Sequence, residues 1–281
     1  MNTIELQAQP SIASSYLKLF TKKTRGMKEG EKLPELKYVL KNITVNHQQL
    51  LPFNTVCGLQ ETQIGITYPY VLAGPTMLAL VAEPSFPLPA AGLLHLRNRI
   101  TQHHVLSIDQ PYEIAVFTAE SRFRPQGLEF DIMTELKSQD ETLWSCKSTF
   151  LKKGKFDRED SASEDEDIFR KLESEPFLSD KLNVPKDIGK IYARICKDYN
   201  PIHISNLAAK LFGYKRSIAH GMWTTAKVVS HLYQATNIKH LDVSFKGPVF
   251  TGSTLYIKHC GNDVNIFCND NPRPVILARV E

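Results

Sequence analysis

The stretch Asp198-Tyr199-Asn200-Pro201-Ile202-His203 determines how the rest of this chain is interpreted. It sets a carboxylate and an imidazole five residues apart, with an Asn-Pro pair between them. Pro201 cannot continue a helix, and it favours an extended conformation at Asn200. We therefore expect a helix to end near Asp198 and the chain to turn, so that His203 comes back within reach of that carboxylate. A second stretch, Ile218-Ala219-His220-Gly221-Met222, then leads into an apolar helix.

The residues around these two stretches predict a helix, a short helix, a longer helix and then a series of strands. Asp187 is a suitable N-cap for the first of these helices. The expected ranges are Ile188–Lys197, Leu207–Phe212 and Gly221–Gln234 for helices, and Leu241–Phe245, Thr254–His259, Val264–Cys268 and Val275–Val280 for strands.

The first half of the chain repeats this order. Helices are expected at His47–Gly58 and Val71–Ala82, and strands at Leu93–Ile100, Tyr112–Ser121, Leu128–Leu136 and Leu143–Leu151. The strand assignments rest on alternating apolar and polar residues between turn signals. A helix followed by an antiparallel meander, present twice, predicts an α+β fold in which a long curved antiparallel sheet wraps two long central helices.

The chain divides into four predicted segments. Residues 1–36 form an N-terminal leader with one short amphipathic helix, Ser14 to Lys22, and residues 37–153 form the first half. Residues 154–183 form an acidic, serine-rich linker that is expected to be solvated, and residues 184–281 form the second half. The lysines and arginine near residues 18–28 predict a solvated arm, with contact to an anionic membrane or an acidic partner as the alternative.

Composition excludes several classes of protein. The longest apolar runs fall short of the roughly 18 residues of a membrane span, and the N-terminus does not resemble a signal peptide. The five cysteines are scattered without a Cys-x-x-Cys pair, which favours a reducing cytoplasm and gives no sign of a zinc site or disulfides. A net charge of +4 without a basic and aromatic stretch does not indicate nucleic acid. No glycine-rich phosphate loop or metal-ligand spacing is present, so we expect no cofactor and no metal, and His103-His104 is interpreted as surface.

The ranges Tyr192–His203 and Gly213–Met222 resemble the hydratase motif of the MaoC-like dehydratases, a group that includes the (R)-specific enoyl-CoA hydratases. The resemblance implies a double hot dog fold with one catalytic half. It also implies acyl-thioester substrates carried on coenzyme A or on acyl carrier protein, in fatty acid metabolism.

The sequence departs from that family at the end of the helix and in the first half. Cys196-Lys197 stands where Ser-Gly is common, and Lys197 either favours the ionised form of Asp198 or points into solvent. In the first half, Leu59 falls where Asp198 would be, and Val71–Gly74 stands in for Ile218–Gly221 without a histidine. The first half is therefore interpreted as a scaffold, which in this family often widens the acyl-chain tunnel.

We assign the chemistry to a carboxylate and an imidazole. Asp198 accepts a proton from the attacking water, and His203 shares that water and delivers a proton to the carbon next to the carbonyl. The N–H of Gly221, at a helix start, is the candidate donor to the thioester oxygen as it becomes enolate-like. Asp, Asn and Pro are also common turn residues, and the downstream Ile218–Met222 stretch is what favours a site over a simple turn.

Four further residues are weaker candidates for substrate contact. His220 is either a buried structural hydrogen-bonder or a pocket-lining residue, and Asn200 more simply braces the loop. Met222 and Trp223 are most simply core of the central helix, with Trp223 lining the acyl pocket as the alternative.

The sequence thus predicts a cofactor-free hydro-lyase that hydrates enoyl thioesters or dehydrates (R)-3-hydroxyacyl thioesters. It would be a pseudo-dimer in one chain, existing as a monomer or a homodimer. The alternatives are a catalytically silent acyl-thioester-binding protein, a hot dog thioesterase, and a scaffold subunit whose acidic linker recruits a partner. Acyl length, carrier and direction of flux stay open.

Overall fold

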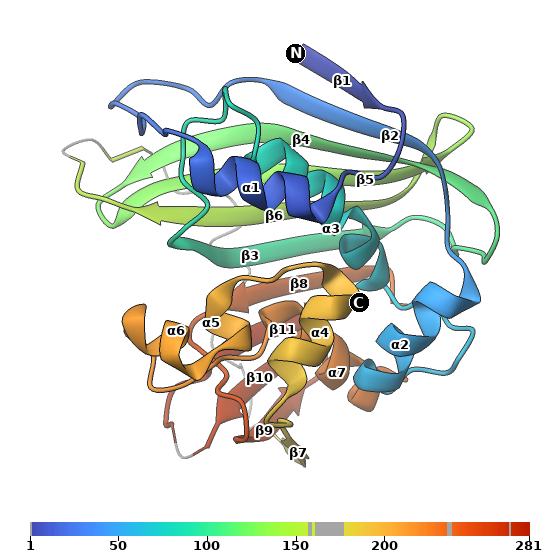
Figure 1. The fold of residues 1–281 in the computed structure, drawn as a ribbon. Helices are drawn as coiled ribbons and strands as arrows, with labels where there is room; N and C mark the ends of the chain where they lie inside the picture. Colours follow the sequence, from blue (N-terminus) through green and yellow to red (C-terminus); the bar gives the residue numbers. More distant parts are fainter. Residues whose placement is uncertain (1, 157–158, 161–176, 235–237, 270) are drawn as a thin grey trace. The chain divides into compact units, whose positions relative to one another are not determined.

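The described part of the chain forms two compact units. The computed structural model (Figure 1) describes residues 2–156, 159–160, 177–234, 238–269 and 271–281. Unit 1 consists of Met1–Thr44 and Leu72–Glu166, and unit 2 consists of Val45–Val71 and Asp167–Glu281. Much of the predicted acidic linker, residues 157–158 and 161–176, lies outside the described residues. None of the helices that the structure describes has the length and hydrophobicity to cross a bilayer.

Unit 1 is built on one sheet whose strands lie in the order β1-β2-β4-β5-β6-β3. Strands β1 and β2 pair in parallel, and the other neighbours are antiparallel. In that order, the strands are Asn2–Leu6, Leu36–Thr44, Pro111–Arg124, Gly127–Ser138, Glu141–Lys153 and Leu93–Gln102. The long meander β4-β5-β6 confirms the predicted strands, whereas β1 and β2 were not predicted.

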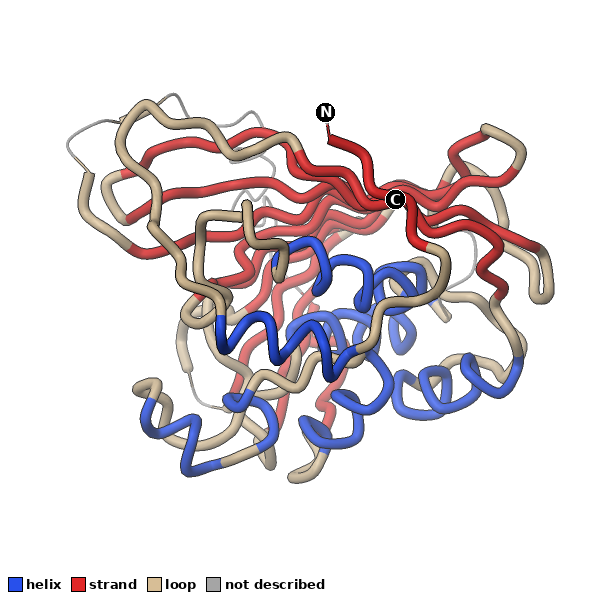
Figure 2. The backbone as a smooth tube through the Cα atoms, turned by 45° about the horizontal axis from the view of Figure 1, so that its top comes forward, coloured by secondary structure: helices blue, strands red, loops and turns tan. Residues whose placement is uncertain are grey.

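Helices cover one face of this sheet, as Figures 1 and 2 show. They are α1, Ile12–Thr21, and the part of α3, Tyr68–Val81, from Leu72 onward. The end of α1 is tied to the core, because Lys22 Nζ donates to the carbonyl of Val81 at 3.0 Å and lies 5.1 Å from the centre of the Phe86 ring. Lys22 is thus partly buried, and this burial lowers its pKa. The N-terminal leader is therefore only in part the solvated arm that the sequence predicts.

Unit 2 has an antiparallel sheet in the order β8-β11-β10-β9-β7. In that order, the strands are His240–Phe245, Ile276–Val280, Asp263–Cys268, Thr254–Cys260 and Phe177–Asn183. Side chains along β10 alternate between half-buried and buried, which gives the sheet one covered face. The predicted linker extended to residue 183, and β7 corrects this: Phe177–Asn183 pairs with β9 through its backbone although its sequence has no clear alternation.

The helices of unit 2 position the candidate site. Helix α7, Gly221–Tyr233, contacts β11, and α4, Ile188–Cys196, leads into two short helices, α5 at Pro201–Ile204 and α6 at Asn206–Leu211. Helix α5 was not predicted, whereas α4, α6 and α7 lie within a residue or so of their expected ranges.

Helix α2, His47–Cys57, comes from the first half of the sequence but packs in unit 2 against α4 and α7. The indole N–H of Trp223 donates to the carbonyl of Val56 at 3.2 Å, and the Ser230 hydroxyl donates to the carbonyl of Gly58 at 2.7 Å. Because both acceptors lie at the C-terminal end of α2, these bonds fix that end against α7.

The helix after α2 begins earlier than predicted. Helix α3 starts at Tyr68, with Pro69 as its second residue, a position in the first turn where the missing N–H of proline costs nothing. Val71–Gly74 is therefore helical. The sequence predicted that Val71–Gly74 corresponds to Ile218–Gly221, and the structure corrects this. Residues 218–220 are not helical but precede α7, and Ile218 forms an isolated β-bridge with Phe250.

Candidate active site

The carboxylate of the motif is placed by the way α4 ends. Lys197, with φ of 62°, adopts the left-handed conformation that closes a helix, and its N–H donates to the carbonyl of Ala193 at 2.9 Å. Asp198 is thereby set just past the helix. At the other end of α4, Asp187 occupies the N-cap as predicted, but its side chain makes no capping hydrogen bond.

The side chain of Lys197 points back toward the helix and not toward Asp198. Its ammonium group donates to the carbonyl of Arg194 at 2.6 Å. A cation on the last carbonyls of a helix is favourable, because those carbonyls lack helical partners and carry partial negative charge. The unusual lysine therefore acts on the end of α4, and the structure gives no support for its convergence on the carboxylate of Asp198.

The Asn-Pro pair forms the turn that brings His203 back. The N–H of Asn200 donates to Asp198 Oδ1 at 3.0 Å, and Asn200 Oδ1 accepts from the N–H of Ile202 at 3.4 Å. Asn200 is thus the N-cap of α5, and Pro201 is its first residue, where a fixed φ suits a helix start. The described contacts of the Asn200 side chain brace the loop, which is the simpler of the two roles expected for it.

A glycine in α4 allows α5 to approach closely. A Cβ atom placed on Gly189 would lie 2.0 Å from the carbonyl oxygen of His203. No side chain could be accommodated without moving the backbone that carries the histidine. Sequence reasoning missed this residue, and its signal was a glycine inside a helix, where glycine is otherwise unfavourable.

The carboxylate and the imidazole face each other across a short gap. Asp198 Oδ2 lies 3.9 Å from His203 Nε2, which is too long for a direct hydrogen bond and short enough for one water molecule to contact both atoms. The other ring nitrogen, Nδ1, donates to the carbonyl of Ile218 at 2.9 Å, so Nε2 is the atom turned to the carboxylate. The Asp198 side chain is 49% exposed and that of His203 is 11% exposed, so the pair opens to the exterior at Asp198.

His220 supports both members of the pair. Its ring stacks on that of His203 with a centroid distance of 3.7 Å, and its Nε2–H donates to the carbonyl of Asp198 at 3.1 Å. Burial, together with the neighbouring His203, lowers the pKa of His220 from 6.5 to about 3. His220 is therefore a neutral donor near pH 7. These contacts describe a structural hydrogen-bonder.

Beneath His220 lies a tyrosine to which sequence reasoning gave no role. Tyr192 is almost completely buried, and its ring centre is 5.2 Å from that of His220. Burial raises its pKa well above the ordinary value, so the phenol stays protonated. It supports the histidine ring from the α4 side. Its motif position was noticed, but only the packing of α4 against the start of α7 shows this contact.

The three side chains Asp198, His203 and His220 also have the spacing of a possible metal site, because one ligand atom from each lies within 4.8 Å of the others. The hydrogen bonds argue for a different use. His220 Nε2 carries a hydrogen toward a carbonyl, and a nitrogen that carries hydrogen cannot bind a metal ion. The arrangement is better suited to exchanging protons with a water molecule.

The start of α7 adds the remaining predicted residues. Gly221 is the first residue of the helix, where an N–H has no intrahelical acceptor, and a Cβ atom there would lie 2.6 Å from the Phe245 ring. Met222 and Trp223 are 5% and 1% exposed, so the structure places both in the core. Gly221 thus follows His220 directly in the chain, whereas the Trp223 side chain is hydrogen-bonded to α2.

Residues 170–271 match the family described as the MaoC like domain. The chain is 27% identical over 253 residues to 3-hydroxyacyl-thioester dehydratase X of Mycobacterium tuberculosis, covering 89% of both proteins. The crystal structure of that protein, HtdX, aligns with a TM-score of 0.74 at 24% identity, over 87% of this chain and 98% of that one.

Two more distant structures share the fold. A MaoC-like dehydratase from Phytophthora capsici aligns with a TM-score of 0.70 at 17% identity, over 88% of this chain and 94% of that one. A conserved hypothetical protein from Mycobacterium tuberculosis, described as having a double hotdog fold, aligns with a TM-score of 0.54 at 12% identity, over 90% and 96% of the two chains. The matched domain, residues 170–271, contains the entire cluster around Asp198.

Proposed function

This chain belongs to the MaoC-like dehydratases and has the double hot dog fold, and from that premise we propose that it is a hydro-lyase of acyl thioesters. It would add water to 2-enoyl thioesters and remove it from 3-hydroxyacyl thioesters in fatty acid metabolism. The observation that carries the proposal is the gap of 3.9 Å between Asp198 Oδ2 and His203 Nε2. Those two groups can hold one water molecule beside a substrate.

In the hydration direction, the water oxygen bonds to the β-carbon of the enoyl group and its proton passes to Asp198. The electrons of the double bond move to the carbonyl oxygen, and the α-carbon takes a proton from His203 Nε2, which requires that His203 enter the step as the imidazolium with hydrogen on both ring nitrogens. The step leaves Asp198 protonated and His203 neutral, and return of the proton from Asp198 to Nε2 restores both groups. Because Nδ1 is engaged with Ile218, Nε2 is the ring atom that can transfer that proton. Each such proton-transfer role contributes roughly 10²–10⁴-fold. Dehydration uses the same groups in reverse.

The carbonyl oxygen needs a donor as negative charge develops on it. The N–H of Gly221, at the start of α7, is our candidate, since it is fixed by the helix before the substrate arrives. Asn200 and His220 position the acid and the base in this scheme. The (R) configuration of the hydroxyacyl group is inferred from the family resemblance, and chiral analysis of the product tests it.

Incubation with crotonyl-CoA tests the proposal. We expect the absorbance of the conjugated enoyl thioester to fall and (R)-3-hydroxybutyryl-CoA to form. Unchanged absorbance at high protein concentration would instead indicate a silent thioester-binding protein. Release of free thiol without a hydroxyacyl product would indicate a thioesterase, so both alternatives have their own readout.

A further inference from the structure

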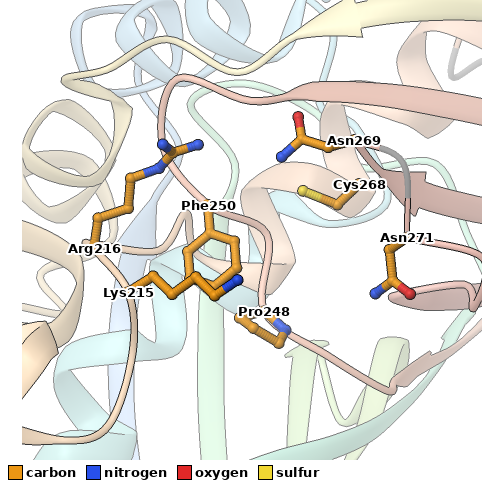
Figure 3. A pocket seen from close by; sticks show the side chains of 7 residues that line it. All are labelled: Lys215, Arg216, Pro248, Phe250, Cys268, Asn269 and Asn271. Atoms are coloured by element: carbon orange, nitrogen blue, oxygen red, sulfur yellow. The ribbon is translucent and has the colours of Figure 1, made fainter.

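Unit 2 contains a second recess to which the proposed chemistry assigns no role. It is a cavity of about 410 Å³ near the loop that precedes α7 (Figure 3). Figure 3 shows the Phe250 ring between the side chain of Arg216 and that of Asn271, with the Lys215 side chain crossing the ring in this view. The lining residues are Lys215, Arg216, Pro248, Phe250, Cys268, Asn269 and Asn271.

Among the described residues that line this cavity, the charged ones are both basic. Lys215 and Arg216 are exposed, and no carboxylate of the described residues pairs with either of them. The guanidinium carbon of Arg216 lies 5.8 Å from the centre of the Phe250 ring, which orients that side chain over the cavity wall. Two cations beside an aromatic ring and amide side chains are suited to a phosphate-bearing ligand.

The cavity is connected to Asp198 and His203 through backbone hydrogen bonds. Ile218 forms a β-bridge with Phe250, and its carbonyl accepts the hydrogen bond from His203. The N–H of Ala219 donates to the carbonyl of Val249 at 2.8 Å. Arg216 is four residues from His220, so their Cα atoms are at most about 14 Å apart at 3.6 Å per residue. Lys215 and Arg216 are therefore close enough to the cluster around His220 for one extended chemical linker to reach from the cavity to that cluster.

Acyl thioesters of both expected carriers have such a linker. The pantetheine arm separates the thioester sulfur from a phosphate by about thirteen bonds, or roughly 15 Å at the 1.2 Å per bond of an extended chain. On the basis of the proposed function, we propose that this cavity binds the phosphate at the end of the pantetheine arm, with Lys215 and Arg216 pairing with its oxygens. Coenzyme A and acyl carrier protein both supply that phosphate.

The test compares substrates with and without the phosphate. In a Lys215→Ala/Arg216→Ala double variant, we expect KM for crotonyl-CoA to rise at least about tenfold while kcat is unchanged, because charge-assisted bonds to phosphate are lost far from the reacting atoms. The constants for crotonyl-pantetheine should stay within twofold. A Lys190→Ala/Lys239→Ala variant removes two exposed charges of unit 2 outside the cavity and should leave both substrates unaffected.

Equal effects of the double variant on crotonyl-CoA and crotonyl-pantetheine would overturn the inference. If the wild type hydrates neither substrate, the proposed hydration fails, and calorimetry then tests the cavity separately. In that experiment the double variant should bind coenzyme A at least tenfold more weakly than the wild type does, and unchanged binding would overturn the cavity assignment. Crotonyl-acyl carrier protein identifies the source: a KM effect with that substrate as well assigns the shared phosphate, and an effect with crotonyl-CoA alone assigns coenzyme A.

Discussion

Helices α2 and α4 end in the same way, yet only one of them carries an acid. Cys57 and Cys196 are the last residues of the two helices, and Gly58 and Lys197 follow in the left-handed conformation with φ of 80° and 62°. The next residue is Leu59 after α2 and Asp198 after α4. The helix ending therefore does not depend on the carboxylate, and the two similar backbone turns differ in the side chain that follows them.

The chain after each turn differs as well. After α4, the Asn-Pro pair starts α5, and residues 218–220 run in a non-helical segment until α7 begins at Gly221. After α2, the chain reaches α3 without a histidine in that position, since Thr67 is the residue before Tyr68. One copy of the arrangement thus presents a carboxylate and two imidazoles, and the other presents none.

The largest effect on turnover should come from replacing Asp198, the residue that follows the turn at the end of α4. We predict that Asp198→Asn lowers turnover of crotonyl-CoA by at least about 10²-fold, because an amide cannot accept the proton of water. Leu59→Asn is the matched control at the end of α2 and should keep wild-type turnover. Steady-state kinetics measures the turnover of both variants, and similar losses of turnover in the two would contradict the comparison.

A second prediction concerns the approach of α4 to α5. Gly189→Ala should displace the His203 backbone and lower turnover by about 10–100-fold, because small errors of position are costly in catalysis. Leu50 occupies the corresponding place in α2, three residues before Phe53, so the close approach is a property of the copy that carries Asp198 and His203. Gly247→Ala is the control, since its Cβ would lie an ordinary 3.5 Å from Val275. Full activity of the Gly189 variant would show that the approach is not required.

A third prediction concerns acid. His220 has a folded pKa of about 3, below its unfolded value near 6.5, so the unfolded chain binds the extra proton as pH falls between those values. Stability present above pH 6.5 should then decline by up to about 1.4 kcal/mol per pH unit. The difference in unfolding free energy between wild type and His220→Asn, from urea titrations at pH 7, 6 and 5, should shrink accordingly. A constant difference would contradict a neutral, buried His220.

The smallest effect concerns Gly58 and Lys197, the left-handed residues that end α2 and α4. Lys197→Gly should stabilise the protein by about 0.5–1 kcal/mol, and Gly58→Ala should destabilise it by about the same amount, because only glycine adopts this conformation freely. Turnover of the Lys197 variant should stay within twofold, since its ammonium group contacts Arg194 and not Asp198. Thermal unfolding measures the first effect. A large loss of turnover would mean that Lys197 acts on the carboxylate after all.

The local parts of this structure could be predicted from the sequence, and the tertiary parts could not. Alternation identified the meander β4-β5-β6, whereas the edge strand β7 has no such pattern because its pairing depends on the backbone of β9. Likewise, the turn that returns His203 to Asp198 follows from Pro201. The stacking of His220 on His203 and the bond to the Ile218 carbonyl depend on the bridge between Ile218 and Phe250, which joins residues far apart in the sequence.

A double-mutant cycle on turnover, made from Asp198→Asn, His203→Ala and the two together, tests most directly whether one acid–base pair in the second half of the chain handles a single water molecule. Each single variant should lose at least about 10²-fold in the hydration of crotonyl-CoA, and the double variant should lose little more, because either change already disables the pair. Losses that multiply, or wild-type turnover in either single variant, would contradict it.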